Sequence, residues 1–156
     1  MAPLRVPLYG EGKATGAGNA IPPDSVLKFE IELLDVTPPS FTSINNETLQ
    51  RNLEQDVKLI DIRRPDEWKE TGVIEGSILI TAFDARGGFV KSFSDDLKKH
   101  VQPDEQFMII CRTGNRTSVL ANALVEQNGY KRVLNIQSGI VDWIREKRPV
   151  TRSINL

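Results

Sequence analysis

The amino-acid sequence predicts an α/β domain in which helices flank a central, mainly parallel sheet. Between residues 46 and 147, short apolar segments typical of buried strands alternate with segments that have helical patterning and capping signals. Strands separated by helices form parallel sheets, because each helix carries the chain back across a face of the sheet. With 39% hydrophobic and 26% charged residues among 156, the composition is that of an ordinary globular protein.

The first half of the domain contains two predicted helices and two predicted strands. Residues 46–54 form a helix behind an asparagine N-cap, and residues 58–62 form a short apolar strand. Pro65 then opens a helical turn at residues 66–71, because proline fits the first position of a helix. Residues 77–80 form the second strand.

The second half repeats this alternation after a long loop. Residues 81–93, which include Gly87 and Gly88, are predicted to form that loop. Gly129 is expected to end the helix predicted at residues 116–127, as glycine commonly does at helix C-termini. The remaining predicted helices cover residues 94–100, 116–127 and 138–147, and the remaining strands cover residues 106–110 and 132–135.

Residues 1–39 differ from the rest of the chain and are predicted to be an extended N-terminal appendage. Glycines and prolines interrupt them except between residues 26 and 36, where apolar and charged side chains alternate as in a half-buried strand. Two consecutive prolines then mark a boundary. The expected division is an appendage and linker at 1–39, a domain at 40–152 and a tail at 153–156.

The charge balance and the cysteine count exclude several classes of protein. The 20 basic and 21 acidic residues give a net charge of -1, so neither nucleic acid nor a membrane is an expected partner. Cys111 is the only cysteine, which excludes an intrachain disulfide and a multi-cysteine metal site. No apolar stretch matches a signal peptide or a membrane span. The expected location is cytoplasmic for the chain as given, or periplasmic if a longer precursor exists.

Cys111 lies where an α/β domain is expected to bind its ligand. It directly follows the apolar strand at residues 106–110, and open α/β sheets bind ligands at the carboxyl ends of their strands. Backbone N–H groups of the following loop, and the start of the next helix, attract an anion there. Helix N-termini and cations lower a thiol pKa from about 8.5 to roughly 3.5–7.5, and Arg112 and Arg116 are the candidate cations. The one histidine, His100, is not adjacent, which disfavours a Cys-His mechanism.

The residues of this loop closely resemble the active-site loop of rhodanese-like sulfurtransferases. They are Cys111, Arg112, Thr113, Gly114, Asn115, Arg116 and Thr117. The resemblance implies that Cys111 is a nucleophile, which takes a sulfane sulfur from a small anionic donor such as thiosulfate and holds it as a persulfide. The remaining residues of the loop would surround this persulfide. Cyanide, a thiol or a protein would then accept the sulfur, and no cofactor or metal is implied.

A second segment resembles the amino-terminal signature of the same family. The signature is matched by Asp61, by Arg63 and by Glu67 with the adjacent Trp68. One residue departs from it, since Val73 stands where a histidine is usual. Asp61 is expected to bond either the cysteine loop or Arg63, and Arg63 to pair with Glu67. We interpret these residues as a supporting scaffold of ion pairs and caps.

A third segment resembles the closing part of the family's domain, so that the resemblance extends over residues 41–152. Gly139 is followed by Trp143, and Ser138 takes the place of a frequent first glycine. Trp143 is expected to be a packing residue, because an aromatic side chain on one face of an amphipathic helix usually belongs to the core.

Two other functions remain open from the sequence. Rhodanese folds also serve as non-catalytic modules, which would dock on a protein partner or relay a persulfide to it. Cysteine phosphatases share the architecture but have a loop one residue longer than the four residues that separate Cys111 from Arg116. The shorter loop makes a smaller anion-binding site, which disfavours phosphate or arsenate chemistry.

Residues 4–36 resemble the last third of an FK506-binding-type peptidyl-prolyl isomerase. In that family the residues matching Tyr9, Ile21 and Phe29 would line part of a proline-binding pocket. The rest of such a domain is missing, and so short a fragment cannot bury a core of its own. No isomerase activity is therefore expected, and the segment should be disordered, dock on the domain or pair with another copy through its unpaired strand.

Overall fold

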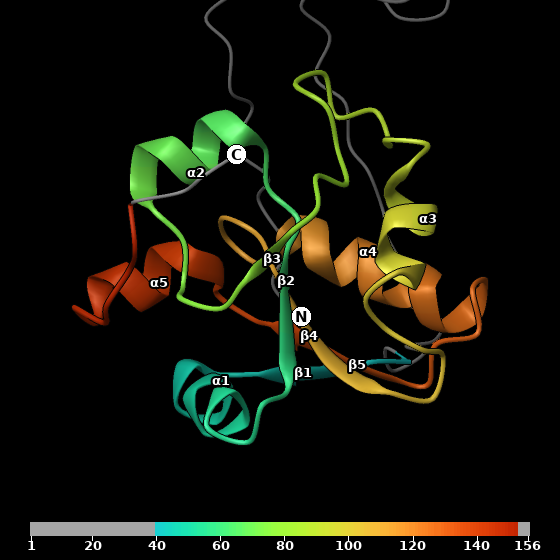
Figure 1. Ribbon diagram of the computed structural model, residues 1–156, viewed down its shortest axis with the longest axis horizontal. Coiled ribbons are helices and arrows are strands. Elements are labelled where there is room, and N and C mark those ends of the chain that lie inside the picture. Colours follow the sequence, from blue (N-terminus) through green and yellow to red (C-terminus); the bar gives the residue numbers. More distant parts are fainter. Residues whose placement is uncertain (1–39, 153–156) are drawn as a thin grey trace, which may run out of the picture. The chain divides into compact units, whose positions relative to one another are not determined.

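Short parallel strands form the centre of the fold (Figure 1). The computed structural model describes residues 40–152. Neighbouring strands are parallel in the order β1-β5-β4-β2-β3, which confirms the expected mainly parallel sheet. The strands are β1 (Thr42–Ile44), β2 (Lys58–Asp61), β3 (Ile78–Leu79), β4 (Gln106–Ile110) and β5 (Arg132–Ile136).

Helices cover both faces of this sheet. One side carries the first and last helices, and the other side carries the third and fourth (Figure 1). The helices are α1 (Asn46–Leu53), α2 (Pro65–Thr71), α3 (Phe93–Lys98), α4 (Asn115–Glu126) and α5 (Gly139–Arg145). The asparagine cap is present as expected, since the Asn45 side chain accepts a hydrogen bond from the Thr48 N–H at 2.9 Å.

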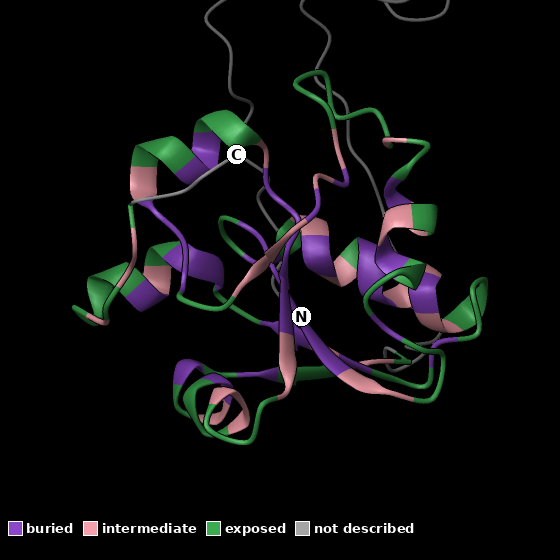
Figure 2. Cartoon of the chain, in the orientation of Figure 1, coloured by how far each residue is buried: buried purple, intermediate pink, exposed green. Residues whose placement is uncertain are grey.

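Side chains along the strands alternate between two hydrophobic cores. In β2, Leu59 packs with α1 and α5, whereas Ile60 packs with α3 and α4. Met108 and Ile109 of β4 alternate in the same way, and all four side chains are buried. Figure 2 shows β2 and β4 coloured as buried over most of their length. Because helices cover both faces, the carboxyl ends of the strands are the place where the fold leaves room for a ligand.

The predicted elements differ from the structure at one strand and at several boundaries. Strand β1 was not predicted, because it has only three residues, of which only Ile44 is buried, and such a short segment shows no alternating pattern. Strand β3 has two residues and α5 ends at Arg145, so both are shorter than predicted. The strand expected between residues 26 and 36, the isomerase-like segment and the tail lie outside the described residues. Among residues 40–152, no helix has the length and apolar character needed to cross a membrane.

Arg63 ties the second helix to the end of the sheet. Its side chain is fully buried and pairs with Asp61, with Nη2 2.7 Å from Oδ2 and Nε 2.9 Å from Oδ1. The same guanidinium donates to the Thr71 hydroxyl and to the carbonyl oxygens of Glu67 and Gly72. A buried charge is tolerated only when it is paired and hydrogen-bonded, and Arg63 meets both conditions.

Replacing Arg63 tests how much this pair stabilises the fold. Arg63→Met leaves the Asp61 carboxylate buried without its partner, so we expect the free energy of unfolding to fall by about 3–5 kcal/mol. Urea denaturation measures the change. Arg51→Met is the matched control, because Arg51 is 62% exposed beside Glu47, and it should change stability by less than about 0.5 kcal/mol. A loss below about 1 kcal/mol for Arg63→Met would show that the pair does not anchor α2.

Candidate active site

The predicted cysteine loop connects β4 to α4 in a tight curve. Cys111 is the first residue after β4, and Gly114 is the N-cap of α4 in the left-handed conformation, with φ of 89°. A Cβ atom at Gly114 would overlap the Gln137 carbonyl, and one at Gly139 would overlap the carbonyls of Cys111 and Arg112. The loop is therefore packed against the start of α5 with room for glycine alone at these two positions.

Backbone N–H groups of the loop point to an anion site. The Gly114 N–H donates to the Cys111 sulfur at 3.2 Å. Within residues 40–152, the N–H groups of the other loop residues have no hydrogen-bond acceptor. These are Arg112, Thr113, Asn115, Arg116 and Thr117. Unbonded N–H groups in the loop that holds the sulfur, at the N-terminus of a helix, favour a negatively charged species at this place.

Within residues 40–152, Thr117 is the other polar contact of the Cys111 sulfur. Its hydroxyl oxygen lies 3.5 Å from the Cys111 sulfur and 3.0 Å from the Gly114 carbonyl oxygen, to which it donates. A hydroxyl has one hydrogen, so in this arrangement a neutral thiol donates to Thr117. When the sulfur carries a negative charge, the Thr117 hydroxyl can turn and donate to it instead.

Glu67 connects α2 to the cysteine loop. Its carboxylate accepts from Arg116 at 2.6 and 2.9 Å, and it also accepts the Arg64 N–H at 3.1 Å. Burial alone would raise the pKa of Glu67, but these hydrogen bonds and the charges of both arginines hold the pKa below its ordinary value of 4.5. The same pairing raises the pKa of Arg116, and negative charge on Cys111 acts in the same direction. Arg116 thus stays charged and fixed beside the loop.

A cavity of about 550 Å³ lies over the outer surface of this loop. It is lined by residues of the loop, of α2, of α4 and of the 81–93 loop. They are Arg64, Glu67, Phe83, Asp84, Ala85, Gly87, Arg112, Asn115, Arg116 and Val119. Cys111 does not line it and is 1% exposed, because the residue belongs to the hydrophobic core that α3 and α4 cover. A substrate in the cavity reaches the sulfur only after the cysteine side chain or the loop moves.

The predicted supporting residues lie beside the loop rather than in the cavity. Asp61 bonds Arg63, which was one of the two expected partners, and Arg63 bonds the backbone carbonyl of Glu67 rather than its carboxylate. Val73, which replaces a histidine of the family, forms a pair of backbone hydrogen bonds with Thr151 at 2.8 and 2.9 Å. Trp143 of α5 is buried in the core that α5 shares with α1, and its indole N–H donates to the Pro149 carbonyl.

Sequence reasoning missed the pairing of Glu67 with Arg116 and the contribution of the 81–93 loop to the cavity. The two charged residues lie 49 positions apart, so no spacing rule could connect them. Only their common place at the carboxyl edge of the sheet offers a signal. The 81–93 loop has no regular pattern from which its position over the cavity could be read.

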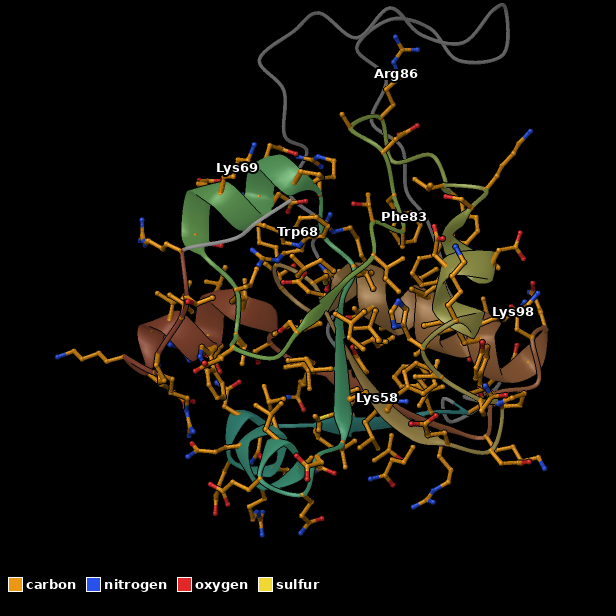
Figure 3. The ribbon with its side chains drawn as sticks, in the orientation of Figure 1. Lys58, Trp68, Lys69, Phe83, Arg86 and Lys98 are labelled. Atoms are coloured by element: carbon orange, nitrogen blue, oxygen red, sulfur yellow. The ribbon has the colours of Figure 1, made fainter. Side chains whose placement is uncertain are left out.

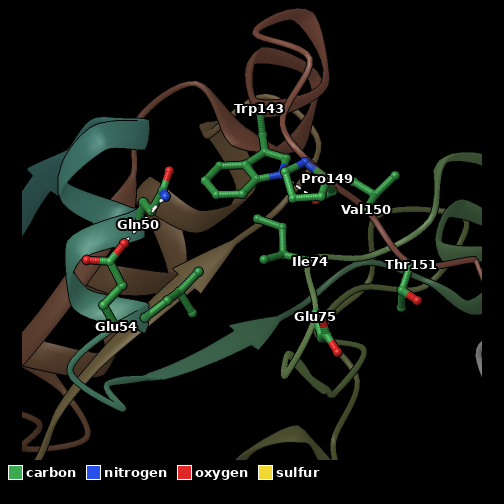
Figure 4. Close-up of a pocket in the computed structure, with 9 residues that line it drawn as sticks. Gln50, Glu54, Ile74, Glu75, Trp143, Pro149, Val150 and Thr151 are labelled. Atoms are coloured by element: carbon green, nitrogen blue, oxygen red, sulfur yellow. Dashed lines mark hydrogen bonds between the residues drawn. The ribbon is translucent and has the colours of Figure 1, made fainter.

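A second cavity, of about 390 Å³, lies between α1 and the segment that follows α5 (Figure 4). Ile74, Trp143, Pro149 and Val150 give it mostly apolar walls, and its charged residues are Glu54 and Glu75. Among residues 40–152, neither the cysteine nor any arginine lines it. The cavity over the cysteine loop is therefore the better candidate for the chemistry.

Comparison with known proteins decides the family. The family model described as "Rhodanese-like domain" matches residues 45–146. The chain belongs to the rhodanese-like domain family. A sulfurtransferase of Allochromatium vinosum is 33% identical to it over 109 residues, which are 69% of this chain and 92% of that protein.

Solved structures agree with this assignment of the rhodanese-like fold. A rhodanese-related protein from Thermoplasma volcanium matches 72% of this chain and 100% of its own with a TM-score of 0.56 and 29% identity. A rhodanese-like domain protein from Staphylococcus aureus matches 66% of this chain and 91% of its own, with a TM-score of 0.52 and 25% identity. The isomerase resemblance of residues 4–36 has no support from these comparisons.

Two glycine substitutions test whether the contact between α5 and the rhodanese loop is tight. Gly139 and Gly129 both have positive φ, of 62° and 76°, so alanine costs about 1–2 kcal/mol of left-handed strain at either position. Alanine at Gly139 also overlaps the Arg112 carbonyl, whereas alanine at Gly129 meets no atom within 4 Å. We expect Gly139→Ala to lose about 1–3 kcal/mol more than Gly129→Ala in urea denaturation. Equal losses would refute the tight contact.

The pH dependence of stability tests the Glu67 pairing. A carboxylate whose pKa is lowered in the folded state contributes stability above its unfolded pKa, here near 4.5, and loses it as the pH falls through the folded value. Glu67→Gln should therefore cost roughly 1.5–3 kcal/mol at neutral pH, and the difference from wild type should shrink as the pH falls below about 4.5 and disappear below the lowered folded pKa. Urea denaturation across this pH range measures it. The control is Glu47→Gln, an exposed carboxylate 4.0 Å from Arg51, and a pH-independent difference for Glu67→Gln would contradict the account.

Proposed function

We propose that this rhodanese-like domain is a sulfurtransferase that moves sulfane sulfur from thiosulfate, or a related donor, to cyanide or a thiol through a persulfide on Cys111. The observation that carries the proposal is the loop that holds Cys111 at the start of α4, in which the Gly114 N–H donates to the sulfur and the N–H groups of the neighbouring residues have no acceptor within residues 40–152. The sulfurtransferase of Allochromatium vinosum, 33% identical over most of its length, supports sulfur transfer in general.

The first step of the reaction loads the cysteine. The Cys111 thiolate attacks the outer sulfur of thiosulfate, the bond between the two thiosulfate sulfurs breaks, and sulfite leaves with the electron pair. Cys111 then carries a persulfide whose outer sulfur is negatively charged. Arg112 and Arg116 stabilise the anionic donor and the departing sulfite, because charged groups fixed in a site require no rearrangement during the reaction.

The second step discharges the persulfide. The carbon of cyanide attacks the outer sulfur, the S–S bond breaks, and thiocyanate leaves while Cys111 returns to the thiolate. The N–H groups of the loop and the Thr117 hydroxyl stabilise the negative sulfur in both resting forms. Glu67 does not contact the reacting atoms, and it positions Arg116 through the hydrogen bonds at 2.6 and 2.9 Å.

Burial of the cysteine favours a second candidate function. Reactive cysteines are partly exposed in most enzymes, whereas Cys111 is 1% exposed. A module that binds a partner, without transferring sulfur to small acceptors, would have no need for an accessible sulfur. The two functions differ in whether the resting loop opens for thiosulfate.

Intact-mass measurement separates these candidates. After incubation with thiosulfate, the protein should gain about 32 Da, the mass of one sulfur, and cyanide should remove it, because the thiolate is the nucleophile that forms the persulfide. Cys111→Ser should show no gain while it keeps the wild-type circular dichroism spectrum and unfolding midpoint. A gain that persists in Cys111→Ser would exclude the cysteine as carrier. No gain in wild type would favour the binding module.

A further inference from the structure

Two exposed apolar side chains lie beside the cavity over the cysteine loop. Within residues 40–152, the large hydrophobic side chains that remain exposed are Phe89, Val119, Val141 and Ile144. Val119 is 68% exposed and lines the cavity, while Phe89 is 50% exposed and packs edge-on against Phe83, another lining residue, with ring centroids 5.8 Å apart. We refer to Phe83, Phe89 and Val119 as the apolar rim. Exposed apolar residues that gather at one concave site mark a surface for a partner.

The turn that carries Phe89 is well ordered by its own hydrogen bonds. Phe83 and Phe89 form a backbone bridge, and the Asp84 N–H donates to the Gly88 carbonyl at 2.8 Å. The Asp84 carboxylate accepts the N–H groups of Arg86 and Gly88, both at 2.8 Å. In Figure 3, Phe83 lies at the base of this turn and Arg86 extends from its tip, away from the sheet.

Phe89 is held in its exposed position rather than folded into the core. Its ring packs edge-on against Phe93, with centroids 5.7 Å apart, and Phe93 is fully buried at the start of α3. A side chain fixed in this way loses little conformational freedom when a partner covers it.

The charges of the cavity favour an acidic partner. Three arginines and two carboxylates line it. The Glu67 carboxylate is occupied by Arg116 and Arg64, and that of Asp84 by N–H groups of its own turn. Arg112 is exposed and forms no ion pair with any of the described residues 40–152. One cation is therefore left to bind a carboxylate from outside.

The cavity is also larger than a small donor requires. Volumes of roughly 300–1,000 Å³ enclose drug-sized ligands, and this cavity measures about 550 Å³. Thiosulfate or cyanide would fill only a fraction of it. A peptide segment fits better, because it can cover the apolar rim and reach Arg112 at the same time.

We propose that the physiological acceptor is a partner protein whose cysteine lies in a segment with apolar and acidic neighbours, and that this segment docks on the apolar rim and Arg112. The inference rests on the proposed sulfur transfer. The partner's thiolate attacks the outer sulfur of the Cys111 persulfide, the S–S bond breaks, and Cys111 leaves as the thiolate. The partner then carries the persulfide, so that no oxidant or reductant is consumed.

Two synthetic peptides test the docking surface. One carries a single cysteine between leucines and glutamates, and the other has lysines in place of the glutamates. Protein loaded from thiosulfate is mixed with each peptide, or with cyanide, and the loss of the persulfide is followed by mass. We expect the acidic peptide to react about tenfold faster than the lysine peptide, because complementary charge speeds association.

Variants of the rim separate docking from the chemistry. Phe89→Ser should lower the rate of sulfur transfer to the acidic peptide about tenfold, since truncation of a buried aromatic contact commonly costs this much affinity. The rate at which cyanide discharges the persulfide should stay within about twofold of the wild-type rate. Ile144→Ser, which removes an exposed apolar side chain from α5, should change neither rate. Val119→Asp should slow the acidic peptide and speed the lysine peptide, and this reversal cannot arise from misfolding.

Three results would overturn the inference. The first is an equal rate of sulfur transfer to the two peptides. The second is a rate of transfer to the acidic peptide that Phe89→Ser leaves unchanged, while cyanide still discharges the persulfide. In these two cases sulfur transfer stands and the docking surface is refuted. The third is the absence of a persulfide after thiosulfate treatment, which overturns the proposed function and the docking inference with it.

Discussion

The buried side chain of Arg63 links the fold to the site. It bonds Asp61 at the end of β2 and the backbone carbonyls of Glu67, in the first turn of α2, and Gly72, the C-cap of α2, so it fixes both ends of the helix to the sheet. The position of α2 in turn places Glu67 opposite Arg116 of the cysteine loop. The buried ion pair of Arg63 and Asp61 thus sets the position of α2 against the loop. Loss of either partner would leave the other charge buried and unpaired, which is strongly destabilising.

The cysteine loop combines a favourable electrostatic environment with restricted access. Its unbonded N–H groups and the start of α4 suit an anion, and Arg116 holds a positive charge beside the loop. Cys111 is nevertheless 1% exposed, belongs to the hydrophobic core and does not line the cavity over the loop. Charge stabilisation and access are therefore separate properties here, and loop or side-chain motion connects them.

Local sequence patterns were sufficient for most of the fold and for the position of the cysteine. Apolar runs gave four of the five strands, and capping residues gave the helices, because these depend on neighbours in sequence. Strand β1 was not predicted, because three residues are too few to show a hydrophobic periodicity. The pairing of Glu67 with Arg116, and the turn of Phe83 and Phe89 over the loop, depend on contacts across the fold, which no local pattern encodes.

The account depends on whether the loop N–H groups receive a negatively charged sulfur on Cys111. A crystal structure of the thiosulfate-treated protein would test this most directly. We predict an additional sulfur atom bonded to the Cys111 Sγ, enclosed by the loop and within hydrogen-bond distance of several of its N–H groups. An unmodified cysteine, or a second sulfur turned away from the loop with those N–H groups still unbonded, would contradict the account.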